Sequence, residues 1–584
     1  MAYTRDYLND NDCPFCHEPR RRDGKPRRQF SYLPFATRLQ GFFQNPKTVE
    51  KLAYRSQFVA SADRVNDVFD SELYQQLLRK HVEIDGQAQP HKYFSGKHDI
   101  AFSLCLDGYL LFGKRMRRSG PSATPIVLQN YNLPPTIRIH MNNLICVGVI
   151  PGPKQPLDWG SFLVPVDDEL AVLAHGLATY DSVEKEMFIL RAYLLFKLGD
   201  MQAINKVLGI RGHNSFAPCR SCHIKGCRNI IDHDTIYYVP LNAPRMPGAP
   251  ARAWDPEHLP MRTHNDFLVS LQAMDDAPSK TACEAIGFNQ GLRERPLLRR
   301  VGSIDYARSI PWDWMHLLLE NVCPLMVDHW MGKFKKLDVG SGNYVIPPLI
   351  WEDIGLETAA AVRSIPAPFV RVLVDIARER SFFTAESWCF WFIYLAPTLL
   401  KGRFQEEKYH RHLCQLVEIM EMSLQFEITY NEIDDLRAKI INWVQDYEKS
   451  AFNPQMLQLT SSDIYCRYYY QYSETRLSAC PAVIHGLLHI PDNIRDCGPE
   501  WSTWTFHMER YCGMLQGCLH SRSQPWGNLN KHILRMAYLA QLHSKFNLEE
   551  ELTVVDKHMT TNALSRYERD FPDCEFYSGV QSSC

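Results

Sequence analysis

The chain has 584 residues, of which 45% are hydrophobic and 12% aromatic, and its formal net charge at pH 7 is -2. This composition is typical of a packed globular protein and excludes general disorder. A nearly neutral chain gives no general argument for nucleic-acid binding, so a DNA-binding surface would have to be local. The longest apolar run, Trp388 to Leu400, contains a proline and is shorter than the ~18 residues of a membrane span. We therefore expect it to be a buried core segment, and we expect no membrane contact.

The N-terminal sequence MAYTRDYLNDNDCPFC lacks the apolar core of a signal peptide, which predicts a chain that stays in the cytosol or nucleus. In that reducing compartment the 18 cysteines are expected to be free, buried or bound to metal rather than paired in disulfides. Each CxxC pair is therefore a possible pair of metal ligands.

In chain order, a basic CxxC stretch (CPFCHEPRRRDGKPRRQF) comes first and predicts a short ribbon, which segments with helical spacing follow. From about residue 97, three short apolar runs predict strands: HDIAFSLCLDGYLLF, ATPIVLQNYNL and LICVGVIPG. A helix over FLVPVDDELAVLAHGLATY and one further strand over EMFILRAYLLFKLGD are expected next.

The second half of the chain has mainly helical patterns, among them WDWMHLLLENVCPLMVDHW, EKYHRHLCQLVEIMEMSLQF and NEIDDLRAKIINWVQDYEK. A proline-rich connector precedes them, and a closing helix follows. This order of elements predicts an α/β protein, with a mixed-sheet core that is interrupted by a large, mostly helical insertion.

Two acids follow predicted strands: Asp107 ends the first strand, and Asp200 ends the fourth. A carboxylate at the end of a buried strand loses its hydration unless a charge compensates it, commonly a metal ion. Two such acids on neighbouring strands, joined by a carboxylate from a helix, would bind two Mg²⁺ ions that activate a nucleophile at a phosphodiester. The alternative is structural: Asp107 belongs to a turn, and Asp200 caps a helix.

A CxxC pair, Cys219 and Cys222, supplies half of a tetrahedral zinc site. The candidates for the other two ligands are His223 and Cys227 nearby, and His485 and His489 much later in the chain. The two late histidines are spaced i, i+4 and share a helix face, although histidines on an apolar face are also common as core residues. Cys13 and Cys16, with His17 nearby, suggest a second small zinc site, but no further ligand pair is evident for it.

Three basic clusters stand out: Arg20 to Arg28, Lys114 to Arg118, and Arg293 to Arg300. The second cluster contains Lys114, Arg115, Arg117 and Arg118, and it follows Asp107 closely. We expect it to bind DNA phosphates at the mouth of the acidic site, with a solvated hairpin as the alternative. The first cluster also has the composition of a nuclear-import signal.

Several long segments resemble CACTA-type (En/Spm-like) DNA transposases, and within them the fungal branch called Plavaka. They are NLPPTIRIHMNNLICVGVIPGPKQP, FILRAYLLFKLGDMQAINKVLGIRGHNSFAPCRSC and CPAVIHGLLHIPDNIRDCGPEWSTWTFHMERYCGML. The resemblance extends over nearly the whole chain. It implies an RNase H-like core and DDE-type chemistry, in which DNA strands are cleaved and transferred with Mg²⁺ or Mn²⁺. It also implies a nuclear homo-oligomer bound to transposon ends and target DNA.

The resemblance also implies roles for individual residues. Asp107, Asp200 and Glu509 correspond to the three catalytic acids, which bind Mg²⁺, and Cys219, Cys222, His485 and His489 correspond to the zinc ligands. The histidine pair would hold the returning chain so that Glu509 lies beside the other two acids. A rival third acid is Glu320, which lies on one helix with Asp313 and His316. We prefer Glu509, because the metal-binding pair upstream provides a means of positioning it.

These assignments predict five regions: a CxxC and basic region with helices (1–95), the first part of the RNase H-like core (96–215), the zinc-bearing helical insertion (216–490), the closing catalytic helix (491–545) and a tail (546–584). The chain starts close to CPFC, where members of the family carry more N-terminal sequence, so a truncated copy is expected. The main alternative to an active transposase is a catalytically inactive, transposon-derived DNA-binding protein. An interaction protein stabilised by zinc would instead require that the three acids lie far apart.

Overall fold

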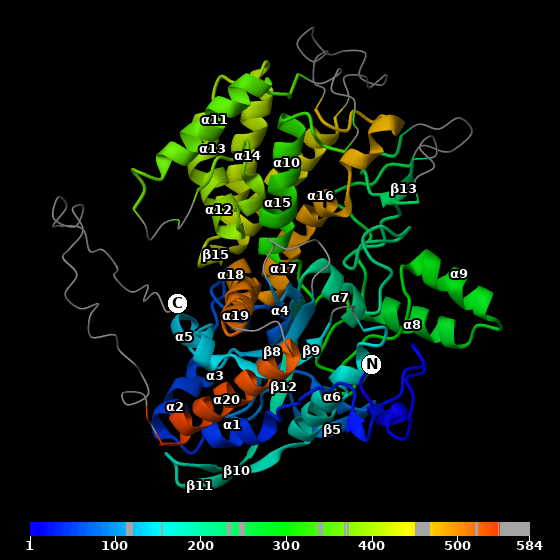
Figure 1. Ribbon diagram of the computed structural model, residues 1–584, viewed down its shortest axis with the longest axis vertical. Helices are drawn as coiled ribbons and strands as arrows, with labels where there is room; N and C mark the ends of the chain where they lie inside the picture. The colour runs from blue at the N-terminus through cyan, green and yellow to red at the C-terminus, as the bar shows by residue number, and fades with distance from the viewer. Residues whose placement is uncertain are drawn as a thin grey trace, which may run out of the picture.

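The computed structural model describes residues 1–112, 121–152, 156–229, 235–244, 252–335, 337, 343–366, 370, 373–449, 468–519, 524–546 and 548. The protein is a mixed α/β structure with two hydrophobic cores. One core surrounds the main sheet and includes residues from the C-terminal helices. The other lies mainly among the helices between residues 219 and 494; most of these helices form the upper body in Figure 1, whereas the helix over residues 264–275 contributes to the first core.

The main sheet contains the strands that the sequence predicts. β6 (Ile100–Leu106), β8 (Ser122–Asn130) and β9 (Ile145–Pro151) pair antiparallel in that order. β12 (Ala192–Gly199) pairs in parallel with the other edge of β6. The short β7 (Tyr109–Leu110) continues beside β8 beyond the end of β6. Every residue of β6 and β12 is buried, as their continuous apolar runs require.

Two sequence predictions for the region just before and within β12 are wrong. The helix α6 (Gly160–His175) ends five residues earlier than the predicted segment, because Gly176 takes a φ of 112° and terminates it. The predicted single strand after it is two strands: β11 (Glu186–Leu190) pairs with β10 (Leu177–Asp181), and β12 joins the main sheet. Three of the five residues of β11 are exposed, so the apolar run combines a half-exposed hairpin strand with a buried central one.

The N-terminal region contains the predicted basic ribbon and helices. Its elements are η1 (Arg5–Tyr7), β1 (Arg21–Arg22), β2 (Lys25–Pro26), α1 (Ala36–Phe42), α2 (Pro46–Leu52), α3 (Tyr54–Gln57), β3 (Arg64–Val65), η2 (Val68–Asp70), α4 (Glu72–Leu77), β4 (His81–Ile84) and β5 (Gln87–Lys92). α5 (Pro135–Arg138) and η3 (Met141–Asn143) connect β8 to β9.

The helices predicted from the long helical patterns in the second half of the chain are present in the structure. α7 (Met201–Val207) follows β12 and belongs to the core of the sheet. The segments after it form the helical body and contain β13 (Cys227–Arg228), β14 (Tyr237–Tyr238), α8 (His264–Asp275), α9 (Lys280–Gln290), η4 (Met315–Val322), α10 (Cys323–Trp330), α11 (Pro348–Ala361), η5 (Arg380–Phe382), α12 (Ala385–Phe390), η6 (Trp391–Leu395), α13 (Ala396–Leu399), α14 (Glu407–Ser423), β15 (Ile428–Thr429), α15 (Tyr430–Glu448), η8 (Glu474–Ala479), α16 (Ala482–Gly486) and η9 (Leu487–His489). The apolar run Trp388 to Leu400 is a largely buried part of this body. Within the described ranges, no helix has both the length and the apolar character that a bilayer crossing requires.

The chain then returns to the sheet through α17 (Ile490–Cys497), α18 (Glu500–Thr503), α19 (Phe506–Gly517) and α20 (Pro525–Phe546). α20 packs against α1 and β9, so the last described helix lies beside the first α-helix of the chain (Figure 1). Met508, Tyr511 and Leu515 of α19 belong to the same core as the sheet. Apart from Phe546 and Leu548, the expected tail of residues 546–584 lies outside the described residues.

Candidate active site and metal centre

Asp107 and Asp200 follow the ends of two neighbouring parallel strands. The last paired residues of β6 and β12 are Leu106 and Gly199, so the next residue on each strand is an acid. The strands approach closely here: a Cβ on Gly199 would lie 2.3 Å from the carbonyl oxygen of Leu106. A glycine before the second acid therefore allows both acids to leave the sheet at the same point.

Asp200 also has the structural role that its position suggested. It is the N-cap residue of α7, and its Oδ1 accepts a hydrogen bond of 2.6 Å from the backbone N–H of Ala203. The cap fixes the orientation of the carboxylate. The charge of Asp200 nevertheless contributes to the raised pKa of Asp107, so the two acids belong to one electrostatic group.

Glu509 comes to this group from the first turn of α19, and Glu320 comes from η4, which is wound as a π-helix. The two side chains share a hydrogen bond. Burial, followed by the charge and the hydrogen bond of Glu320, raises the pKa of Glu509 to about 7. Because Glu509 and Glu320 meet, both candidates for the third acid lie at the same place.

Asp107 lies within electrostatic reach of Asp200, Glu320 and Glu509. Burial raises its pKa to about 6, against the favourable charge of His316 and together with the charges of Asp200 and Glu320. The site therefore holds an excess of carboxylates that burial and mutual repulsion destabilise in their charged form. The described residues form two groups whose possible ligand atoms all lie within 4.8 Å of one another, and these acids are in neither group.

A buried network joins the two helices that carry the glutamates. Asp313, just before η4, accepts hydrogen bonds of 2.8 Å from both the backbone N–H and the hydroxyl of Thr505, just before α19. The ring Nδ1 of His316 also bonds to Asp313, and its Nε2 lies 3.8 Å from a carboxylate oxygen of Glu320. Although burial opposes protonation, the charge and the hydrogen bond of Asp313 raise the pKa of His316 to about 10. A protonated imidazole therefore offsets part of the negative charge.

Thr505 is the residue of this network that the sequence reasoning missed. A threonine directly before a helix is a usual N-cap residue, which is the one available signal. In the structure its side chain makes no cap and bonds to Asp313 instead. Sequence patterns do not contain this contact, because the two residues are 192 positions apart.

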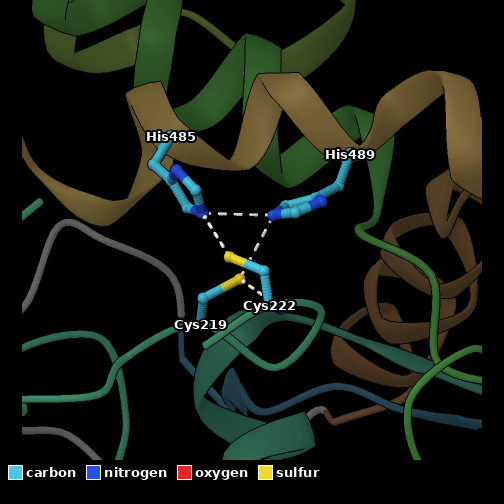
Figure 2. A group of neighbouring side chains, drawn as sticks. All are labelled: Cys219, Cys222, His485 and His489. Atoms are coloured by element: carbon cyan, nitrogen blue, oxygen red, sulfur yellow. Dashed lines mark hydrogen bonds between the residues drawn. The ribbon is translucent and has the colours of Figure 1, made fainter. Parts of the chain in front are cut away.

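The cysteine and histidine pairs form a possible Cys₂His₂ metal site (Figure 2). Cys219 and Cys222, at the start of the helical body, face His485 and His489, at its end. The Sγ atom of Cys219 lies 3.3 Å from Nε2 of His489, and the Sγ atom of Cys222 lies 3.2 Å from Nε2 of His485. The two imidazole nitrogens are 3.1 Å apart. All four side chains are buried.

This donor set fits zinc. With Zn–S bonds of about 2.3 Å and Zn–N bonds of about 2.0–2.1 Å, tetrahedral coordination places sulfur and nitrogen ligands about 3.5 Å apart and two nitrogens about 3.3 Å apart. The separations between these ligand atoms are close to those values. Burial opposes ionisation of Cys219, but the hydrogen bond with Cys222 and the charges of His489 and His485 lower its pKa well below the usual value.

The histidine segment packs directly on η4. A Cβ on Gly486, between the two histidines, would lie 3.0 Å from both Trp312 and Leu317. The ring of Trp312 also lies nearly parallel to that of His489, with an interplanar angle of 9°. The cysteine–histidine cluster is therefore in contact with the segment that carries Asp313, His316 and Glu320.

The nearby alternative ligands do not join the cluster. His223 lies 3.3 Å from Asp266, and the Sγ atom of Cys227 accepts a hydrogen bond from Arg252. Cys13 and Cys16 belong to neither of the two possible metal-binding groups among the described residues.

The predicted DNA-contacting residues Lys114, Arg115, Arg117 and Arg118 lie outside the described residues. In the third basic cluster, Arg300 pairs with Asp85 and Asp168, and Arg295 pairs with Asp275. These ion pairs neutralise part of that cluster and favour a structural role for it.

Comparison with known proteins gives one family. A family model described as transposase family tnp2 matches residues 80–241. The matched segment contains Asp107, Asp200, Cys219 and Cys222, whereas Glu320, His485, His489 and Glu509 lie beyond it. A search of curated proteins found no match. The match, which covers less than half of the chain, supports a relation of this segment to that transposase family.

Proposed function

We propose that the chain is a DDE-type DNA transposase, which cleaves DNA and transfers the cut strand at the site formed by Asp107, Asp200 and Glu509. The observation that carries this proposal is the electrostatic coupling of Asp107 with Asp200, which follows the neighbouring strand, and with Glu509 on a distant helix. The family match covers the segment with the two aspartates, and the resemblance of the longer segments favours the CACTA type and its Plavaka branch.

The topology supports an RNase H-like core. The sheet has three antiparallel strands in chain order, β6, β8 and β9, and then β12 in parallel beside β6. Acids at the ends of β6 and β12 and a third acid on a helix that returns late are the arrangement that such a core uses. The zinc-bearing helical insertion then lies between β12 and that helix.

The acids fit divalent cations with oxygen ligands, Mg²⁺ or Mn²⁺. Burial first, and then the charges of neighbouring carboxylates, raise the pKa of Asp107 and of Glu509, so a bound cation would stabilise their charged forms. When bound, such ions activate water or a 3′-hydroxyl and stabilise the leaving oxygen in an in-line displacement. Asp200 is held by its cap, and Glu509 is held by the first turn of α19, so both carboxylates are oriented before a substrate arrives.

Zinc at Cys219, Cys222, His485 and His489 would fix the start of the helical body to its end. In this proposal its role is structural, because four protein ligands leave no position for a substrate. It would support the placement of η4, and beyond it of α17 to α19, beside the sheet.

The proposal includes DNA as the partner, both as transposon ends and as target, and a homo-oligomer that acts in the nucleus. Phosphate contacts from Lys114, Arg115, Arg117 and Arg118 would position the strand without reading its sequence. A catalytically inactive, transposon-derived DNA-binding protein is the competing function.

Asp107→Asn is the test of the cleavage proposal. The amide keeps the size of the side chain and removes its charge, so Mn²⁺-dependent cleavage of DNA with a supplied terminal repeat is expected to fall by more than about 100-fold. The matched control is Asp99→Asn. Asp99 is buried at the opposite end of β6, and burial raises its pKa to about 6 as well, but it lies outside the acid cluster.

Cleavage by wild type and Asp99→Asn, with none by Asp107→Asn, supports the active transposase. Equal cleavage by all three proteins would overturn the proposed site. If wild type binds the DNA but never cuts it, with Mg²⁺ or with Mn²⁺, the inactive DNA-binding derivative is the better description.

A further inference from the structure

A second group of possible metal ligands lies at the other end of the sheet. It consists of His98, two residues before β6, and Asp181 and Glu184 in the β10–β11 hairpin. Their ligand atoms all lie within 4.8 Å of one another. The hairpin lies at the end of the molecule opposite the helical body, so this group is separate from both sites described above (Figure 1).

The closest pair in the group has the wrong geometry for a simple hydrogen bond. Nε2 of His98 lies 3.0 Å from Oδ2 of Asp181, yet neither atom has a hydrogen-bond partner among the described residues, which means that the oxygen lies off the N–H direction. Two ligands that bind one metal ion at about 2.1 Å, at right angles, are about 3.0 Å apart. The contact therefore has the spacing of two ligands that share a cation.

The burial of Asp181 strengthens this interpretation. Its side chain is only 1% exposed. Oδ1 accepts the backbone N–H groups of Val183 and Glu184 at 2.7 and 3.1 Å and shapes the turn. Oδ2 is buried without a hydrogen bond, and a carboxylate oxygen in that state is costly unless a cation compensates it.

The third ligand, Glu184, faces solvent. Two phenylalanine rings hold the imidazole of His98 in place. Oε2 of Glu184 is 3.9 Å from Nε2 of His98, and the side chain is 38% exposed. Rings of Phe43 and Phe188 pack against the imidazole, with centroids 5.2 and 4.6 Å away. Lys97 pairs with the other oxygen of Glu184, so it leaves Oε2 available.

We propose that His98, Asp181 and Glu184 bind one divalent first-row metal ion through Nε2, Oδ2 and Oε2. One nitrogen and two carboxylate oxygens suit Mn²⁺ or Zn²⁺ and differ from the thiolate set of the Cys₂His₂ site. The ion would fasten the β10–β11 hairpin to the start of β6. Water on the side of Glu184 would complete the coordination.

Mn²⁺ is the probe for this site, because thiolate ligands do not favour it. The experiments use full-length protein with Asp107→Asn in the background, which weakens metal binding at the acid cluster. Electron paramagnetic resonance should detect bound Mn²⁺ with a coupling to one imidazole nitrogen, and Mn²⁺ should raise the melting temperature. His98→Gln should remove the nitrogen coupling and weaken Mn²⁺ binding by more than about 10-fold.

Asp181→Asn provides a second variant, since its Oδ1 can still accept the two turn N–H groups while the charge is lost. The matched controls are Lys97→Gln, which breaks the ion pair but keeps all three ligands, and Glu186→Gln, which removes a hairpin carboxylate outside the group. Both controls should bind Mn²⁺ as the background protein does. Unchanged nitrogen coupling in His98→Gln, or an equal loss of Mn²⁺ binding in Lys97→Gln, would overturn the proposal.

Discussion

At the scale of residues, the acid cluster is defined by charge that the fold does not fully compensate. Asp313 and His316 form a hydrogen-bonded pair, and the hydroxyl of Thr505 donates a further hydrogen bond to Asp313. The pairing lowers the pKa of Asp313 and raises that of His316, so it favours the charged form of both side chains. At Asp107 and Glu509 the charge of His316 is outweighed, and burial raises the pKa of each. The charge that burial destabilises is therefore concentrated on two of the three acids that are proposed to bind metal.

These pKa values predict how stability depends on pH. In the folded state Glu509 holds its proton up to about pH 7, whereas in the unfolded state it loses the proton near the ordinary glutamate pKa of 4.5. Between these values the unfolded state binds fewer protons, so stability falls as pH rises. Asp107 acts in the same direction between the ordinary aspartate pKa of 3.8 and about 6.

Asp107→Asn should therefore melt higher than wild type at about pH 8, by roughly 2–4 °C, and the difference should disappear near pH 4. Mn²⁺ should raise the melting temperature of wild type at the higher pH and have a smaller effect on the variant. Thermal melts over this pH range measure both effects. A variant that is less stable than wild type at every pH would contradict the prediction.

The two glutamates lead to a second prediction at this scale. Glu509→Gln should lower the rate of Mn²⁺-dependent cleavage by more than about 100-fold, since it removes a proposed metal ligand. Glu320→Gln should retain most of the activity, because an amide can still share a hydrogen bond with Glu509. Cleavage rates of the two variants decide the assignment, and the reverse order would give the third role to Glu320.

At the scale of elements, the Cys₂His₂ cluster joins parts of the chain that are far apart in sequence. Cys222 and His485 are separated by 263 positions. The histidine segment of the cluster also lies against Leu317 of η4 and against Trp312 just before it, so its integrity bears on the segment that carries His316 and Glu320. A bound zinc ion would thus stabilise the helical body and the approach of η4 to the sheet together.

The zinc prediction uses the double variant Cys219→Ser, His489→Ala. Wild type should contain about one zinc per chain at this cluster, and the variant should lose it and be destabilised by several kcal/mol, as is typical when a structural metal is removed. Elemental analysis and chemical denaturation measure the two quantities. The matched control is Cys227→Ser, since Cys227 lies near the CxxC pair but outside the cluster. Unchanged zinc in the double variant would remove the assignment.

At the scale of the whole molecule, the two hydrophobic cores meet where the chain returns. Ile490 and Ile494 of α17 belong to the helical core, whereas Met508 and Tyr511 of α19 belong to the core of the sheet. Glu509 lies in the second of these helices, so its position depends on the closure of both cores. A local change in the helical body can therefore alter the acid cluster without touching an acid.

DNA binding is the prediction at this scale. Replacing Arg115, Arg117 and Arg118 with Ala should weaken binding equally for all DNA sequences. The slope of log K against log salt should become shallower by roughly 2–3, because each phosphate that is no longer neutralised reduces it by about 0.9. The control is Arg295→Ala, whose guanidinium pairs with Asp275. Binding titrations at several salt concentrations test this. A slope unchanged by the triple variant would mean that the basic cluster is only a solvated hairpin.

The sequence by itself determined the strands β6, β8 and β9, the major helices, and the residue types of both candidate sites. Continuous apolar runs, helical periodicity and CxxC spacing are patterns among residues that are close together in sequence. For that reason the sequence alone predicts the elements that they indicate. The same local patterns merged β11 with β12, because an apolar run does not show whether a strand pairs in a hairpin or enters a buried sheet.

Only the tertiary structure decided which distant residues meet. It brought His485 and His489 to Cys219 and Cys222, selecting them over the nearby His223 and Cys227. It placed Glu509 beside Glu320, and it joined Thr505 to Asp313. It also gathered His98 with Asp181 and Glu184 from separate parts of the chain. The physical reason is that each of these contacts requires the packing of two cores and the pairing of strands far apart in sequence, which no local pattern encodes.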